Sequence, residues 1–148
     1  MDEPIDQPSD QQMHLVMTPV REARAADFER FLTEVVGPAI DARRPDLSDR
    51  WQVLRAAGSV AGAVTFVLLL RGGSLMGDWD LDALLATHYG EEGADRLARE
   101  WGDTFAELTP WADATAALGQ AANQLAWTLT PVDVTGAAGS TPSAPPGA

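Results

Sequence analysis

An apolar run at Ala63–Leu70, bounded by Gly62 and Gly72, limits what this chain can fold into more than any other feature. It is rich in β-branched and aromatic side chains, and its length suits a strand covered on both faces of a sheet. It is far too short to cross a bilayer, which requires about 20 apolar residues. We therefore expect this run to be the central strand of the fold.

The flanking pattern predicts further strands and helices on both sides of this run. Helical spacing of apolar residues predicts a helix over 21–42, in which Gly37-Pro38 introduces a kink because Pro38 has no N–H to donate. A second helical region is expected in two pieces that meet at Gly90, followed by a short helix. The predicted strands lie at 12–20, 50–56, 63–70 and 124–132, and the helices at 21–42, 81–89, 91–105 and 112–122.

The resulting order, βαββαβ with an elaborated second helical region, predicts an α+β fold. Such chains usually form a four-stranded antiparallel sheet with both helical regions on one face, the ferredoxin-like arrangement. The strands carry apolar residues such as Val16, Val67 and Leu69, and one face of each strand must point away from the helices. We expect no part of a domain of this size to cover that second face, so the sequence predicts a homodimer in which two sheets pack together.

Composition indicates that neither end of the chain belongs to the folded domain. Residues 1–11 are acidic and hold little that could pack, so we expect a disordered arm. Residues 133–148 are dominated by Gly, Ala, Ser, Thr and Pro, as in a flexible tail. The folded domain is therefore expected at 12–132.

Charge and residue usage exclude several kinds of chemistry. The chain has no cysteine and no lysine, which excludes thiolate sites, disulfides and Schiff-base catalysis. Its net charge of −12 repels nucleic acids and anionic lipid headgroups, so neither is an expected partner. The first residues show no secretory leader, and a cytoplasmic location is expected.

The element order and two local patterns resemble the dimeric α+β barrel superfamily. The patterns are the helix from Phe28 to Ile40 that runs through Gly37-Pro38 and the hairpin formed by 50–55 and 63–71. The resemblance covers Met13–Val132 and is nearest to members related to antibiotic-biosynthesis monooxygenases and polyketide cyclases. It implies a dimeric α+β barrel domain at 12–132, with a pocket between sheet and helices for a bulky aromatic or polycyclic ligand.

Several aromatic side chains are candidates for the walls of such a pocket. Indole rings stack on flat ligands, and their N–H groups reach ligand oxygens. The alternative for Trp101, which shares helical spacing with Leu97 and Phe105, is a place in the core. The candidate substrate-binding residues are Trp51, Tyr89, Trp101, Trp127 and His14.

Two further residues are candidates for catalysis. His88 could remove a proton from a phenol or from a carbon flanked by carbonyls. Arg55, on the same strand face as Trp51, could stabilise the oxyanion that results. The alternatives are a helix-end histidine at His88 and an exposed strand-end arginine at Arg55.

The remaining polar candidates favour structural roles. His14 begins the first strand, where a structural role competes with one at the dimer interface or the mouth of the barrel. Asp78 and Asp80 precede a helix; either could act as a base, but capping of the helix is expected to account for at least one of them. The two histidines have no carboxylate at ligand spacing, so we expect no metal site and no cofactor.

Three functions remain open at this stage. The first is a cofactor-independent monooxygenase of an aromatic or polyketide natural product, with His88 as base and Arg55 as oxyanion partner. The second is a cyclase or pericyclic catalyst that holds a flexible substrate in a reactive shape. The third is a non-catalytic ligand-binding dimer.

Overall fold

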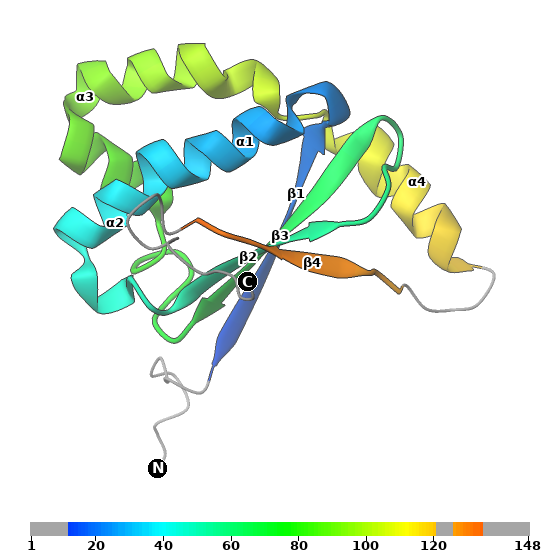
Figure 1. Cartoon of the computed structure of the whole chain (residues 1–148), viewed down its shortest axis with the longest axis horizontal. Coiled ribbons are helices and arrows are strands. Elements are labelled where there is room, and N and C mark those ends of the chain that lie inside the picture. The colour runs from blue at the N-terminus through cyan, green and yellow to red at the C-terminus, as the bar shows by residue number, and fades with distance from the viewer. Residues whose placement is uncertain (1–11, 121–125, 135–148) are drawn as a thin grey trace, which may run out of the picture.

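The computed structural model describes residues 12–120 and 126–134. In this part of the chain the fold is α+β, with one four-stranded antiparallel sheet and helices packed on it (Figure 1). The strands are β1 (Met13–Arg21), β2 (Trp51–Ala56), β3 (Ala63–Arg71) and β4 (Leu129–Val132). The helices are α1 (Ala25–Phe31), α2 (Gly37–Arg43), α3 (Leu81–Trp101) and α4 (Leu108–Gln120).

β3 is an inner strand of the sheet, as its apolar run predicts. The strand order is β1-β3-β2-β4, and every neighbouring pair is antiparallel. Seven of the nine residues of β3 are buried, and β1 and β2 pair along both of its sides. The last strand lies beside β2, at the edge of the sheet opposite β1.

The first helical region covers one face of the sheet, and its kink takes the form of a π-helical turn. Leu32–Val36 is π-helical, and the Gly37 N–H donates to the Leu32 carbonyl five residues earlier. This wider turn comes directly before Gly37-Pro38, and Pro38 has no N–H to donate. The apolar stripe continues through it: Phe28, Leu32, Val36 and Ile40 are all buried and belong to one core cluster with Phe66 and Leu68 of β3.

α4 packs on the other face of the sheet. Side chains alternate along β3, so Phe66 faces α1, where its ring lies 4.8 Å from that of Phe28, and Thr65 faces away. The indole Nε1 of Trp111 in α4 donates to the Thr65 hydroxyl at 2.8 Å. In Figure 1, α4 accordingly lies beyond the strands, apart from the group formed by α1, α2 and α3. The expectation that both helical regions lie on one face, with nothing in the chain to cover the other, is therefore wrong for α4.

The connection from α3 to α4 passes the free edge of β1. Phe105 forms a single antiparallel bridge with Val20, and the Ala106 N–H donates to the Pro19 carbonyl at 3.1 Å. From there the chain reaches the second face and returns to the opposite edge as β4. This connection is long enough to cross the second face of the sheet, so the last strand can pair with β2 at the edge opposite β1.

The termini of the folded part differ slightly from the expected limits. Val134 is buried in the core cluster, so the folded part includes two residues that composition assigns to the tail. The acidic arm at 1–11, the first residues of the strand expected at 124–132, and the tail beyond residue 134 lie outside the described residues. No helix in the described ranges is long and apolar enough to cross a membrane.

Candidate functional site

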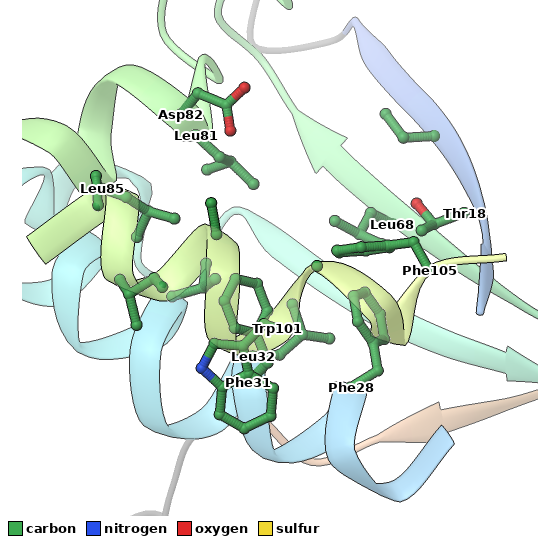
Figure 2. A pocket seen from close by; sticks show the side chains of 16 residues that line it. Thr18, Phe28, Phe31, Leu32, Leu68, Leu81, Asp82, Leu85, Trp101 and Phe105 are labelled. Carbon is green, nitrogen blue, oxygen red and sulfur yellow. The ribbon is translucent and has the colours of Figure 1, made fainter. Parts of the chain in front are cut away.

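A cavity of about 570 Å³ lies between the sheet, α1 and α3. One side is formed by β1 and β3 through Val16, Thr18 and Leu68. The helical side is lined by α1, the π-helical turn and both halves of α3 (Figure 2). The cavity therefore lies between one face of the sheet and the helices that cover that face.

Aromatic rings form one wall of this cavity. The Phe28 ring lies 5.6 Å from that of Phe105 in an edge-on arrangement, and the Phe31 ring lies 5.4 Å from the indole of Trp101. The guanidinium of Arg30 lies 5.5 Å from the Trp101 ring and covers it from outside. Edge-on and tilted ring pairs of this kind provide a stiff apolar surface for another aromatic molecule.

The π-helical turn contributes directly to the cavity. Leu32 and Val36, the first and last residues of the turn, both line it. The Tyr89 hydroxyl of α3 donates to the Val35 carbonyl within the same turn at 2.7 Å. This bond ties the middle of α3 to the first helical region and so helps to fix the width of the cavity.

α3 crosses the cavity as two helical pieces. Gly90 has φ 80° and ψ 165°, a backbone conformation that is essentially restricted to glycine. Leu81, Asp82 and Leu85 line the cavity before this break, and Ala94, Leu97 and Trp101 line it after the break. The predicted division of this region at Gly90 is confirmed, and it gives α3 the bend with which it spans the cavity.

Apart from the indole N–H of Trp101, which has no hydrogen-bond partner, Asp82 and Thr18 supply the polar side-chain groups that line the cavity among the described residues. The neighbouring carboxylates are already engaged. Asp80 caps α3 by accepting from the Ala83 N–H at 3.1 Å, and Asp78 accepts from the Ser74 N–H at 2.9 Å. The capping role expected for Asp80 is therefore confirmed.

Asp78 is also held by Arg44, whose Nη2 lies 3.1 Å from its Oδ1. The backbone N–H of Ser74 and then the Arg44 guanidinium lower the pKa of Asp78 below its usual value. Stabilised as an anion, Asp78 is poorly suited to act as a base.

Of the seven residues predicted from the sequence to form a site, Trp101 lines the cavity. The other six lie outside its lining. Arg55 forms an ion pair with Glu29 at 2.9 Å, and its guanidinium lies 5.8 Å from the Phe66 ring. Trp51 packs against the core cluster beside Gly37, and Trp127 lies half-buried just before β4.

The two histidines also lie outside the lining of the cavity. Arg43 donates to Nδ1 of His88 at 3.3 Å, which requires that nitrogen to be unprotonated, and the Tyr89 ring lies 4.5 Å from the imidazole. The Nε2 of His14 bonds to the Gly73 carbonyl at 2.9 Å. The described residues contain no group of carboxylates and histidines that could hold a metal ion.

Sequence reasoning misses most of the residues that line the cavity. Phe28, Phe31 and Phe105 share helical spacing with other apolar residues, and this spacing predicts a place in the core for them. The periodicity identifies an inward face, but it does not tell whether the opposite element fills the space. For Asp82, the available signal is its position two residues after a capping aspartate, on the first turn of a helix with an inward apolar face.

A scan against protein-family models, a search of curated proteins and a search of solved structures each found no match to the chain.

Proposed function

We propose that this chain binds a bulky apolar or aromatic small molecule in the cavity between sheet and α3. The observation that supports this most directly is the cavity itself, which has the volume of a small-molecule site and a wall of four aromatic rings. Apolar pockets with few polar groups bind ligands mainly by burying apolar surface, and the polar groups then set orientation. A flat polyketide-type or other aromatic natural product fits this description.

The catalytic role that the geometry supports best is that of a cyclase or pericyclic catalyst. Such an enzyme accelerates reaction by holding a flexible substrate near its reactive shape, for which stiff apolar walls are sufficient. The cavity supplies these walls through Phe31, Trp101 and the π-helical turn. A cofactor-independent monooxygenase is the second candidate, and it requires a base at the substrate.

His88 and Arg55 are the proposed base and oxyanion partner for that second candidate. In the structure each is engaged by another side chain, Arg43 and Glu29 respectively, outside the lining of the cavity. A monooxygenase would therefore have to release both contacts when substrate binds. This requirement makes the cyclase the first choice and the monooxygenase the alternative.

The protein is also proposed to act as a homodimer with the architecture of a dimeric α+β barrel. β1 and β2 are joined through α1 and α2 and are separated in the sheet by β3, the split β-α-β arrangement of ferredoxin-like folds. On the second face, Met13, Leu15 and Met17 of β1 are 59%, 58% and 37% exposed. An apolar strip of this kind on a sheet is typical of a surface that packs against a partner.

Sedimentation velocity at micromolar concentration tests the dimer. Leu15→Glu places a charge on the exposed strip and is expected to give a monomer. Met76→Glu adds the same charge at a side chain that is 86% exposed elsewhere, and it should leave the dimer intact. A wild-type monomer would refute the dimer without affecting the ligand site.

The binding proposal is tested by filling the cavity. Ala94 lines it, whereas Ala83, on the same helix, is exposed and does not. We expect Ala94→Phe to weaken binding of naphthalenemethanol, a neutral two-ring probe, by about tenfold or more, because the added ring occupies the ligand volume. Ala83→Phe should bind as the wild type does. Equal binding by both variants in equilibrium dialysis would place the ligand elsewhere.

The reaction class is tested by supplying a linear poly-β-ketone thioester with and without oxygen. Cyclised product formed without oxygen, and lost in Ala94→Phe but not in His88→Ala, would support the cyclase. Product that requires oxygen, a quinol-type substrate and His88 would support the monooxygenase. Tight binding without product under either condition would favour a ligand-binding protein.

A further inference from the structure

The cavity has two chemically different ends. The aromatic wall formed by Phe28, Phe31 and Trp101 lies at one end, and the Asp82 carboxylate lies at the other, beside Leu81 at the start of α3 (Figure 2). Asp82 is the one ionisable side chain among the described residues that line the cavity. A ligand that spans the cavity would therefore meet apolar rings at one end and an anion at the other.

The Asp82 carboxylate has no hydrogen bond or ion pair within the described ranges. This distinguishes it from the two aspartates just before it, since Asp78 is held by Ser74 and Arg44, and Asp80 caps the helix. Arginines neutralise other acidic residues of this face, as Arg24 does for Asp27 and Asp103. No arginine lies among the described residues that line the cavity. The charge of Asp82 is thus left for a partner from outside the chain.

The net charge of the whole protein also favours a cationic ligand. With a net charge of −12, the protein attracts cations and repels anions over distances of about a Debye length, roughly 8 Å at physiological salt. Asp82 is itself exposed, so an amine paired with it stays partly hydrated and the ion pair contributes only a modest preference. The net charge and the Asp82 carboxylate together favour a cationic ligand over a neutral one, and a neutral ligand over an anionic one.

We infer that the cavity selects an aromatic or polycyclic ligand that carries a protonated amine, with the amine paired to Asp82 and the rings held against Phe28, Phe31 and Trp101. The inference rests on the proposed function, because it assigns a substrate class to the same cavity. It adds that an amine-bearing compound is accepted and that a carboxylate-bearing compound of the same size is rejected.

Three naphthalene compounds of similar size test this selection. Naphthylmethylamine is cationic at pH 7, naphthalenemethanol is neutral and naphthoic acid is anionic. In equilibrium dialysis at pH 7 and low salt, we expect the amine to bind about two- to five-fold more tightly than the alcohol, the range typical of an exposed ion pair. The acid should bind most weakly, and added salt should reduce the preference for the amine.

Variants of Asp82 identify the residue responsible. Asp82→Asn keeps the shape of the side chain and should make the amine and the alcohol bind equally, whereas Asp82→Glu should retain the preference. Asp95→Asn is the matched control, because Asp95 is an exposed aspartate of the same helix that does not line the cavity. It removes the same unit of charge and should leave the preference almost unchanged.

The outcomes separate this inference from the proposal on which it rests. If the wild type binds the alcohol but shows no preference for the amine, or if the preference survives Asp82→Asn, the assignment of Asp82 is refuted and the cavity remains the binding site. If the preference falls equally in Asp82→Asn and Asp95→Asn, net charge rather than Asp82 is responsible, and the assignment is again refuted. If neither the amine nor the alcohol binds to the wild type, both the inference and the binding proposal fail.

Discussion

The two helical regions that cross the same face of the sheet differ sharply in how much they bury. Between Phe28 and Ile40, the first region places six apolar side chains in the core, and Ile40 and Ala39 are 0% exposed. α3 is longer, with 21 residues, but only Gly93 and Trp101 are buried. The apolar residues of its first half, Leu81, Leu84 and Leu85, are all half-buried.

This difference shows that the first region is part of the core and that α3 is a cover. The first region packs on β3 directly, through the 4.8 Å contact between the rings of Phe28 and Phe66. α3 is held at separate points instead, by the bond from Tyr89 to the Val35 carbonyl and by the contact of Trp101 with Phe31. The space between these points and the sheet is the cavity. Larger side chains in this space would stabilise the fold, so the open space is consistent with the ligand binding proposed above.

Truncation of a side chain in each region gives the largest expected contrast. Ile40→Ala removes a fully buried side chain and should lower the free energy of unfolding by about 2–5 kcal/mol. Leu85→Ala removes a half-buried side chain that already borders empty space, and it should cost about 1 kcal/mol or less. Urea unfolding followed by tryptophan fluorescence measures both values. Equal losses would mean that α3 is as much a part of the core as the first region.

The two regions should also differ in how they tolerate a Cβ atom added at a glycine. A Cβ at Gly37 would lie 3.2 Å from the Leu32 carbonyl oxygen and 3.3 Å from that of Val134, and backbone atoms cannot easily move away. We expect Gly37→Ala to lower the free energy of unfolding by about 1–2 kcal/mol, since the overlap outweighs the gain in helix propensity.

Gly102, at the end of α3, is the matched control for Gly37. Its φ of −61° suits alanine, and a Cβ there would meet nothing within 4 Å. Gly102→Ala should therefore be neutral or should stabilise the fold by up to about 1 kcal/mol. A loss of stability at Gly102 similar to that at Gly37 would show that α3 tolerates no more change than the closely packed region does.

The same contrast explains which features were predictable from the sequence. Local signals were sufficient for the inner strand at 63–71 and for the break at Gly90, because each depends on a run or on one residue type. At Gly37-Pro38 they indicated an irregularity, which the structure has one turn earlier, as the π-helical turn at Leu32–Val36. The face on which α4 packs was not predictable in this way. It depends on a contact between Trp111 and Thr65, which lie 46 residues apart.

The site residues were harder to predict than the elements for a related reason. His88 and Arg55 have side chains suited to catalysis, but in the structure they contact Arg43 and Glu29, which lie 45 and 26 residues away in the chain. The cavity itself results from a gap between two amphipathic faces. Periodicity describes each face separately and contains no information on the distance between them.

One contact between the two regions is the bond from the Tyr89 hydroxyl to the Val35 carbonyl, and its removal should have a smaller effect. Tyr89→Phe leaves the ring in place and removes the donor, so that the carbonyl depends on water. We expect a loss of about 1 kcal/mol in the free energy of unfolding. Hydrogen exchange should show increased opening of α3 with little change in β3. Increased exchange in both elements to the same degree would contradict the role of Tyr89 as a local anchor.

The titration of Tyr89 tests the same anchor without a mutation. Burial raises the pKa of the Tyr89 hydroxyl above its usual value of about 10. The chain has one tyrosine, no lysine and no cysteine. Tyrosinate absorbance near 295 nm, followed from roughly pH 9 to pH 12 around the usual tyrosine pKa, therefore reports on Tyr89 alone. The folded state holds the phenol proton more tightly than the unfolded state does. The contribution of Tyr89 to the free energy of unfolding is therefore fully present below about pH 10, and it is lost as the pH rises through the pKa of the folded state. Tyr89→Phe should lack this alkaline loss of stability. A tyrosine that titrates at its usual value in the folded protein would show that α3 lies open to water at its midpoint, and the cover would then be attached only through Trp101.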